Sequence, residues 1–410
     1  MKILHITTVR TGSTGRTASD LKSYLTGKGE EYRIAFSIPD QKPLDGDILI
    51  GNYFDHKLHA LLSRLTGLQG YFSYFATRAF LKKVKAYQPD LVQLGNLHAN
   101  YINLPLMFRF LAKERIPVVM ILHDCWFFTG GCTHFTAINC VKWKTECRHC
   151  SVLKESKESW FFDRSRKAFQ DRKKWYGNLA SLTVSAVSDW EKELAKQSPL
   201  FSKANVVRNY NWINTDTFKP ATQEQIQEVR QKYKLSSKVK YVVTVSAGWS
   251  MESTRTKDAI RLSSILPDEY RLIVVGGAEA GIFPQIVVSI PHTSDQKELA
   301  ALYTLSSAYL HFSVEDTFGK VIAEAMACET VPVVFDSTAC GETASPYGIA
   351  VKPHDVEAMA GAIPLANDVK RKRKVRDYAL SHYNALFNKE RYYSLFKEII
   401  DKTPNSNEKD

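Results

Sequence analysis

The sequence has no stretch that is long and apolar enough to span a membrane, because no window holds the roughly 18 apolar residues that a spanning helix needs. The apolar run at residues 1–8 gives way to Gly, Ser and Thr before the apolar region of a signal peptide is complete. We therefore expect a cytoplasmic protein that reaches lipid only from the side, as a peripheral protein on the inner face of the cell membrane. Its seven cysteines should stay reduced there.

The sequence also lacks nucleic-acid-binding signatures and the compositional bias of disordered chains. With 44% hydrophobic and 24% charged residues, its composition is typical of a globular protein. A chain of 410 residues is too long to fold around one ordinary hydrophobic core, which predicts two domains of about 200 residues each. The formal net charge of +12 then favours an anionic membrane surface over nucleic acid as a partner.

Basic and aromatic residues are interleaved between residues 56 and 87. They are His56, Lys57, Arg64, Arg78, Lys82, Lys83 and Lys85, with Leu61, Leu62, Leu65, Tyr71, Phe72, Tyr74, Phe75, Phe80 and Leu81. This amphipathic pattern can lie in a lipid headgroup layer and fits an acceptor site at a membrane surface. The alternative is that the aromatic stripe packs the segment onto its own domain, and the sequence leaves both interpretations open.

Short apolar runs alternate with helical patterns in both halves, which predicts parallel sheets wound by helices. In the first half we expect strands at 2–6, 48–50, 91–94, 118–122, 182–184 and 206–207. In the second half we expect strands at 241–245, 271–275, 308–312 and 331–335.

The most informative stretch runs from residue 313 to residue 328. Asp316 lies in a predicted strand-to-helix turn, and Glu324 lies one to two turns inside the predicted helix 320–327. Carboxylates at these places can accept hydrogen bonds from sugar and ribose hydroxyls. The residues that open the helix and can face an anion are Thr317, Phe318, Gly319 and Lys320. The alternative is a surface acidic pair at an ordinary helix start.

This stretch resembles the donor-site motif of retaining GT-B glycosyltransferases (glycosyl transferases group 1, family 4), written Glu-x7-Glu followed by Ala-x-Ala-Cys-Gly-Thr. Asp316 and Glu324 occupy the acidic positions, while Glu329 stands where glycine is usual. The resemblance covers nearly the whole chain and is closest to the bacterial branch that builds exopolysaccharide, capsule and colanic-acid-like polymers. It implies an α/β protein of two Rossmann-like domains, with parallel sheets facing across a cleft.

The resemblance also implies the domain limits. Residues 1–211 are expected to form the acceptor-side domain, and residues 212–388 the nucleotide-sugar donor domain. Residues 389–410 are expected to hold a helix that crosses back to the first domain and a polar tail. The boundary lies in Asn211–Pro220, which is similar to the family's Asn-Gly-Ile-Asp-x3-Phe-x-Pro segment, with Trp212 and Asn214 as departures.

Two loops in the first half follow predicted strands. At residues 11–17, glycines let the backbone approach a phosphate. The resemblance places Gly12 and Gly15 against the donor phosphates, with Arg16 as an acceptor contact, and a plain turn is the alternative. His123 follows the strand 118–122, where ligands of open α/β sheets bind. In the family a histidine here touches the transferred sugar, and a buried structural histidine is the alternative. His98 follows another strand on the acceptor side.

Five of the seven cysteines lie between residues 125 and 150. Cys147 and Cys150 have zinc-knuckle spacing, and Cys132 with Cys140 can complete a closed, structural zinc site. A set of buried reduced thiols is the alternative. The resembling branch shares this insertion, which favours a structural role beside the acceptor cleft.

In the second half, the strand at 241–250 is similar to the one that ends at the donor diphosphate, which implicates Gly248. Relatives follow it with cations that neutralise the leaving diphosphate, but here Thr254 stands at the lysine position. Arg255 or Lys257 can substitute through a shifted loop. Loss of preorganised charge slows such a reaction, so this departure bears on whether the protein is active.

Further along, the strand at 272–277 ends in glycines that include Gly276. The segment 287–299 resembles the loop that holds the nucleobase through backbone contacts, with Ile290 at the contact position. Such contacts do not distinguish uracil from guanine, so the resemblance implies a UDP-sugar or GDP-sugar donor.

The function implied is transfer of a sugar, with retention, from a nucleoside diphosphate sugar to a lipid-linked or polysaccharide acceptor. The leaving phosphate takes the acceptor's proton, and no catalytic cofactor is implied. Two alternatives stay open. One is a non-enzymatic glycan-assembly subunit that has lost its diphosphate cations at Thr254. The other is a sugar-nucleotide epimerase, which acts on the donor without an acceptor.

Overall fold

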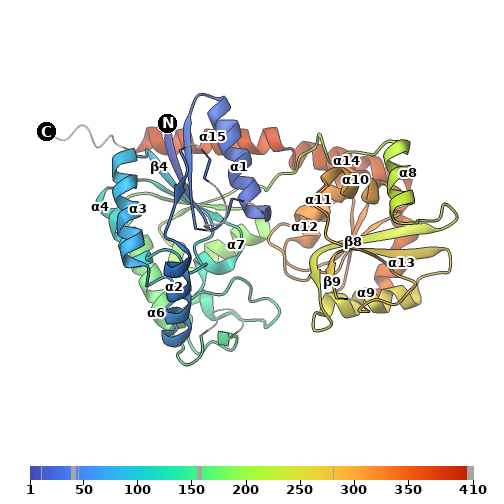
Figure 1. Ribbon diagram of the computed structural model, residues 1–410, viewed down its shortest axis with the longest axis horizontal. Coiled ribbons are helices and arrows are strands. Elements are labelled where there is room, and N and C mark those ends of the chain that lie inside the picture. Colours follow the sequence, from blue (N-terminus) through green and yellow to red (C-terminus); the bar gives the residue numbers. More distant parts are fainter. Residues whose placement is uncertain (11, 38–42, 45, 155–158, 280, 404–410) are drawn as a thin grey trace. The chain divides into compact units, whose positions relative to one another are not determined.

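The computed structural model describes residues 1–10, 12–37, 43–44, 46–154, 159–279 and 281–403. The chain divides into two units (Figure 1). The first consists of Met1–Asn209 together with Lys389–Asp410, and the second of Tyr210–Asn388. The chain therefore passes from one unit to the other twice.

The first unit contains a sheet of seven described strands, all parallel, in the order β3-β2-β1-β4-β5-β6-β7. The strands are β1 (Lys2–Ile6), β2 (Glu31–Phe36), β3 (Ile48–Leu49), β4 (Leu91–Leu94), β5 (Val118–Leu122), β6 (Leu182–Ala186) and β7 (Asn205–Arg208). The predicted strands 2–6, 91–94 and 118–122 are confirmed with the same bounds, whereas β2 was not predicted.

The main helices of this unit are α1 (Gly12–Gly27), α2 (Tyr53–Thr66), α3 (Tyr74–Tyr87), α4 (Leu104–Lys113), α6 (Ser165–Gly177), α7 (Asp189–Gln197) and α15 (Ala385–Lys402). Side chains of α3, α4 and α6 pack with alternate strand residues such as Leu4, Val92 and Met120 in one buried core. On the other face α15 joins α1, where Tyr24 donates a hydrogen bond to Glu390.

The segment between β1 and α1 is held by a buried carboxylate. The side chain of Asp47 is fully buried, and its oxygens lie 2.9 Å from Nη1 of Arg10 and 2.6 Å from Nζ of Lys22. The backbone amide of Ile34 also donates to Asp47, over 3.1 Å. Two cations and an amide thus share one carboxylate, which fixes the approach to α1.

The second unit contains a sheet of six described strands in the order β10-β9-β8-β11-β12-β13, again parallel. The strands are β8 (Lys240–Trp249), β9 (Tyr270–Ala278), β10 (Val288–Ile290), β11 (Tyr309–His311), β12 (Pro332–Phe335) and β13 (Ile349–Val351). The helices are α8 (Gln223–Lys232), α9 (Thr254–Ile265), α10 (Gln296–Leu305), α11 (Lys320–Ala327), α12 (Cys340–Ala344), α13 (Val356–Ala366) and α14 (Val369–His382).

Helix α11 explains one departure from the family motif. Its cap residue is Cys328, and the next residue, Glu329, has a φ of 59°. The left-handed region favours glycine, which is the residue that relatives carry at this position. Glu329 is accepted here with local strain, and Arg376 donates a hydrogen bond to the nearby carbonyl of Ala327. The substitution therefore concerns the end of the helix.

Replacing Asp47 with alanine should destabilise the first unit by about 3–5 kcal/mol, because two partly buried cations lose their contacts with this buried carboxylate. Chemical denaturation followed by tryptophan fluorescence measures this change. Glu193→Ala, which breaks an exposed pair with Lys196, should change stability by less than about 1 kcal/mol. Equal effects of the two substitutions would contradict the structural importance of the buried carboxylate.

Candidate functional site

Three neighbouring strands of the second sheet end at the same edge. Strands β9, β8 and β11 are adjacent and parallel, so their carboxyl ends bring together Gly276, Gly248 and the loop that carries Asp316. Open α/β sheets bind ligands at this edge. Residues that are far apart in the sequence therefore lie at one edge of the sheet.

Asp316 is fixed by contacts to its backbone and its side chain. Its amide donates to Oγ1 of Thr338 over 3.1 Å, and its carbonyl accepts from the amide of Ala339 over 3.2 Å. Oδ2 lies 2.8 Å from Nε2 of His311. About a third of the Asp316 side chain stays exposed (34%), so the carboxylate is both positioned and accessible.

Glu324 lies in the second turn of α11, where it is half-buried. Burial raises the pKa of the nearby Tyr309 to about 12, and the charges of Asp316 and Glu324 both act in the same direction. Both carboxylates therefore lie close enough to Tyr309 to influence its hydroxyl. The structure brings this acidic pair into one region of the second unit.

The start of α11 is built as the motif predicted. Gly319 precedes the helix with a φ of 75°, a conformation that favours glycine. Thr317 and Phe318 are buried, and the Phe318 ring packs against Tyr210 and Tyr383. Because these side chains point into the core, the anion-binding potential of the segment lies in its backbone. Lys320 is the first helical residue and is half-buried.

The ends of β8 and β9 lie side by side and are rich in glycine. Gly276 has a φ of 135°, and a Cβ atom there would lie 2.0 Å from the carbonyl oxygen of Ser246. Gly248 pairs with Gly277 beyond an irregularity in the ladder. Glycine is thus required by backbone contact at Gly276, while Gly248 is exposed at the end of its strand.

Arg255 and Lys257 differ in position. Nη1 of Arg255 donates to Oγ of Ser246 over 3.0 Å, which places its guanidinium beside the end of β8. Lys257 and Thr254 are exposed on α9. Of the two proposed substitutes for the missing lysine, Arg255 is therefore the one beside the glycine-containing strand ends. Ile290 ends β10 with a fully buried side chain, so any contact it makes with a ligand involves its backbone.

In the first unit, His123 follows β5 at the carboxyl edge and is half-buried. Burial, together with the neighbouring His123, lowers the pKa of His5 on β1 to about 3. Nε2 of His98 lies 3.0 Å from Oδ2 of Asp124. Burial alone raises the pKa of Asp124, but hydrogen bonds from His98 and from the Trp126 amide lower it below its ordinary value.

Asp124 is a residue that the motif analysis did not single out, although it is adjacent to His123. Since β4 and β5 are neighbours, the residues that follow them were a recognisable signal. The pair of His98 and Asp124 links the two loops at the carboxyl edge of the first sheet. The carboxyl edge of the first sheet therefore carries a hydrogen-bonded histidine–aspartate pair next to His123.

The glycines after β1 have different explanations. Gly12 opens α1 with a φ of 71° and has open space around it, which suits a phosphate or acceptor contact. A Cβ atom on Gly15 would lie 2.3 Å from the carbonyl carbon of Arg10, so packing alone requires this glycine. Thr11, which the predicted loop includes, is outside the described residues.

The four-cysteine zinc site receives no support. Cys132 and Cys147 are buried, whereas Cys140 and Cys150 are half-buried. Sγ of Cys147 accepts a hydrogen bond from the Gly130 amide over 3.1 Å. Within the described ranges, the one group of three or more potential metal ligands within 4.8 Å of one another is His311, Asp316 and Cys340. The zinc site stays a prediction.

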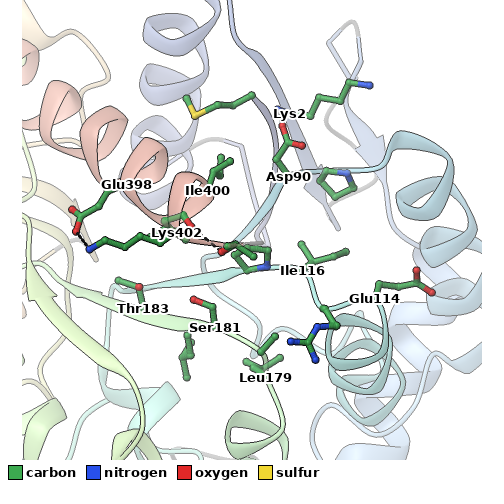
Figure 2. A pocket seen from close by; sticks show the side chains of 18 of the residues that line it. Lys2, Asp90, Glu114, Ile116, Leu179, Ser181, Thr183, Glu398, Ile400 and Lys402 are labelled. Carbon is green, nitrogen blue, oxygen red and sulfur yellow. Dashed lines mark hydrogen bonds and ion pairs between the residues drawn. The ribbon is translucent and has the colours of Figure 1, made fainter. Parts of the chain in front are cut away.

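A cavity of about 1530 Å³ lies in the first unit, at the amino ends of its strands. Figure 2 shows Lys2, Asp90 and Thr183 around it, with Glu398 and Lys402 of α15. Ligands of parallel α/β sheets bind at the opposite edge. We therefore assign neither donor nor acceptor to this cavity, despite its size.

Comparison with known families places a domain in the second unit. Residues 225–380 match the family model described as "Glycosyl transferases group 1". This range contains the strand ends, Asp316 and Glu324 described above. Comparison of the sequence with curated proteins finds no match.

Solved structures of low sequence identity share the fold. A glycosyltransferase from Rickettsia africae has 15% identity and a TM-score of 0.66, with coverage of 98% of this chain and 99% of that one. For sucrose-phosphate synthase from Thermosynechococcus elongatus the identity is 16%, the TM-score 0.69, and the coverage 98% and 100%. Anabaena HepE in complex with UDP has 15% identity and a TM-score of 0.65, with coverage of 97% of this chain and 100% of that one.

The fold is therefore GT-B, with two Rossmann-like domains of parallel strands and helices, as the sequence predicted. Within the second unit, residues 225–380 are similar to the glycosyl transferases group 1 family.

Arg255→Ala should weaken binding of UDP or GDP by roughly 10- to 100-fold, the loss typical of a hydrogen bond to a charged group. Lys257→Ala should change the affinity less than about twofold, because that side chain is exposed. Isothermal titration calorimetry measures both. A larger loss in the lysine variant would reverse this assignment.

Proposed function

We propose that this protein transfers a sugar, with retention, from a nucleoside diphosphate sugar to a lipid-linked glycan in bacterial surface polysaccharide synthesis. The observation that carries the proposal is the acidic pair Asp316 and Glu324, within a segment that matches a glycosyltransferase family. HepE, a structural neighbour, has been solved with UDP-glucose, and WaaG, another neighbour, is a glycosyltransferase involved in lipopolysaccharide biosynthesis. Both are consistent with the proposal.

In this proposal, the two carboxylates grip hydroxyl groups of the donor, with Asp316 on the sugar and Glu324 on the ribose. The amides at the start of α11, Lys320 and Arg255 face the diphosphate, where negative charge develops as the glycosidic bond breaks. The departing phosphate accepts the acceptor's proton, so positioning and charge stabilisation supply most of the rate enhancement. His123, next to the hydrogen-bonded pair of His98 and Asp124, contacts the transferred sugar and helps to hold the reacting geometry.

The non-enzymatic alternative follows from Thr254, which stands where relatives carry a lysine. Arg255 argues against it, since its guanidinium lies beside the end of β8. The transferase should bind and turn over a sugar-nucleotide donor, whereas the non-enzymatic subunit should do so weakly or not at all.

Among UDP-, GDP- and dTDP-sugars, the wild type should bind one nucleotide class, and Glu324→Ala should weaken that binding by about tenfold or more, since a charge-assisted hydrogen bond is lost. Calorimetry or saturation-transfer NMR detects the binding. Glu357→Ala, which removes an exposed glutamate of the same unit, is the matched control and should bind normally.

Absence of binding across the whole panel would reject the transferase and favour the non-enzymatic subunit. Conversion of the donor sugar into its epimer without an acceptor would instead identify an epimerase.

We also propose that the first unit docks on an anionic membrane surface, where the acceptor lipid lies. Large apolar side chains are exposed on α2, α3 and a neighbouring segment: Tyr53, Phe54, Leu58, Leu61, Leu65, Tyr74, Phe75, Trp160, Phe161 and Phe162. Trp160 donates its amide to the carbonyl of Arg64, which joins that segment to α2. Such a concentration of exposed apolar groups marks an interaction surface.

The exposed cations on the same two helices, Lys57, Arg78, Lys82, Lys83 and Lys85, complement anionic headgroups. Phe80 and Leu81 instead face the core, so the structure supports both interpretations of residues 56–87, each for different side chains. None of the described helices has the length and apolar composition needed to cross a bilayer.

Replacing Phe54 and Phe75, which are 82% and 83% exposed, with serine should reduce binding to phosphatidylglycerol-containing vesicles by about tenfold or more, because two apolar side chains no longer insert. Co-sedimentation measures the bound fraction. Leu365→Ser, at an exposed site of the second unit, should bind as the wild type does. Failure of the wild type to sediment with these vesicles would contradict the docking surface.

A further inference from the structure

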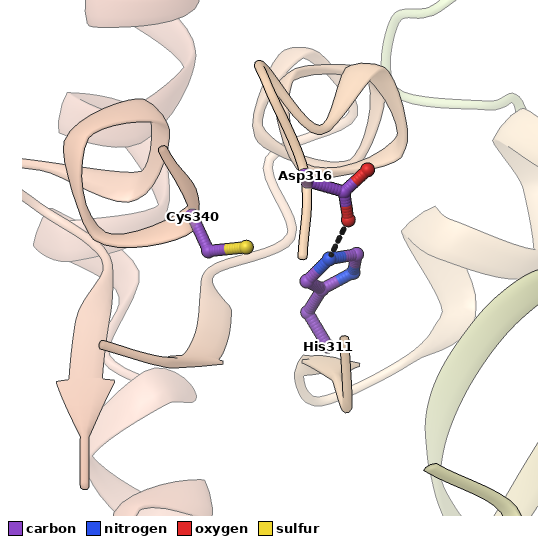
Figure 3. A group of neighbouring side chains, drawn as sticks. All are labelled: His311, Asp316 and Cys340. Atoms are coloured by element: carbon purple, nitrogen blue, oxygen red, sulfur yellow. Dashed lines mark hydrogen bonds and ion pairs between the residues drawn. The ribbon is translucent and has the colours of Figure 1, made fainter. Parts of the chain in front are cut away.

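A buried histidine lies directly behind the carboxylate of Asp316. His311 ends β11 and is 5% exposed. Its Nε2 lies 2.8 Å from Oδ2 of Asp316, and its Nδ1 lies 2.8 Å from the hydroxyl of Tyr309. Figure 3 shows the ring turned toward Asp316, with the thiol of Cys340 close to both side chains.

We propose that His311 is a positioning residue that fixes the carboxylate of Asp316 for the donor sugar, with Tyr309 fixing the orientation of the His311 hydrogen. This inference rests on the proposed function, because it gives Asp316 the role of holding the sugar. It adds a residue that lies outside the acidic motif and touches no ligand itself.

The direction of the hydrogen bonds follows from their partners. An ionised carboxylate only accepts, so Nε2 of His311 must carry the hydrogen that it shares with Asp316. Burial raises the pKa of Tyr309 to about 12, so the Tyr309 hydroxyl keeps its proton at neutral pH. Nδ1 of a neutral ring then accepts from Tyr309, and Nδ1–H of a charged ring donates to the hydroxyl oxygen. In either state, Nε2–H points at Asp316.

The electrostatic surroundings favour the same arrangement. Burial lowers the pKa of His311, but the hydrogen bond with Asp316 acts in the opposite direction, and the pKa of His311 is raised above its ordinary value. A charged ring strengthens the hydrogen bond to the carboxylate. Nε2–H of the buried histidine thus faces Asp316 whether the ring is neutral or charged.

The loop backbone has separate anchors. The amide and carbonyl of Asp316 bind Thr338 and Ala339, and Sγ of Cys340 lies 3.7 Å from the carbonyl oxygen of Ser313. Loss of His311 should therefore leave the loop in place and remove one hydrogen bond from the carboxylate of Asp316. A variant without His311 should therefore bind the sugar less well but bind the nucleotide normally.

A metal ion shared by His311, Asp316 and Cys340 is the competing explanation for this cluster. Two ligand atoms on one tetrahedral zinc ion, at bonds of about 2.0–2.1 Å, lie about 3.3 Å apart. The 2.8 Å between Nε2 and Oδ2 is instead a hydrogen-bond distance. The geometry therefore favours the hydrogen-bonded pair.

The test compares three variants by calorimetry, with UDP or GDP and with the matching sugar nucleotide. His311→Leu should leave affinity for the nucleoside diphosphate within about twofold and weaken binding of the sugar nucleotide by about tenfold, the loss expected for one charge-assisted hydrogen bond. His311→Gln retains a donor and should recover most of that loss. His354→Asn alters another histidine–aspartate pair of this unit, with Asp258, and should match the wild type.

The inference would be overturned if His311→Leu lost affinity equally for both ligands or for neither. It would also be overturned if His311→Gln did not recover affinity for the sugar nucleotide. Failure of the wild type to bind any sugar nucleotide would instead overturn the proposed function. A measurement that needs no ligand tests the positioning role separately from the proposed function. Long-range proton–nitrogen NMR of the ring should show a hydrogen on Nε2 and a shift of that signal in Asp316→Asn. A ring protonated only at Nδ1 would overturn the positioning role whatever the ligand results.

Discussion

Parallel strand pairing is the constraint on which both candidate sites depend. In a parallel sheet every strand ends at the same edge, so the loops that follow neighbouring strands must meet there. In the second unit this constraint gathers residues from the ends of β9, β8 and β11, which are separated by long stretches of sequence. In the first unit the same rule joins the loops after β4 and β5 through His98 and Asp124.

Side chains in these loops are held in place by partners in the strands or helices beside them. Asp47 binds Arg10 and Lys22 and so fixes the chain before α1. His311 reaches from the last position of β11 to Asp316 in the loop that follows. In the first case, buried charges stabilise the fold. In the second, one oxygen of a partly exposed carboxylate is oriented while the side chain stays accessible. The same kind of contact therefore stabilises the fold in one unit and, in our proposal, prepares a carboxylate for ligand recognition in the other.

The sequence predicted the central strands well because each is a short, almost wholly apolar run that the sheet buries on both faces, as in β5. Strand β2 was missed because Glu31 and Arg33 interrupt its apolar pattern. The acidic pair was recognisable from its spacing, and the structure brings both residues near Tyr309. His311 was not recognisable, since a histidine in an apolar strand gives no sign of its partner until the loop geometry is known.

Other differences have equally local causes. Packing against the Arg10 backbone accounts for Gly15, which the motif had assigned to a ligand. A left-handed backbone at Glu329 accounts for the glycine of the relatives. The choice between Arg255 and Lys257 needed the side-chain direction, which residue spacing on a short helix does not give. Sequence patterns therefore located the strand ends, whereas the roles of single side chains required their contacts.

Helix α15 has a consequence for how the chain folds as it is synthesised. From Lys389 onward this helix belongs to the first unit, where Tyr392 bonds with Ser185 of β6 and Glu390 bonds with Tyr24 of α1. The whole second unit lies between these partners in the sequence. A ribosome therefore releases a nearly complete first sheet long before the helix that covers part of it. During that interval the part of the first unit that α15 covers stays open to solvent and to chaperones, and the first unit is completed only after the second has emerged.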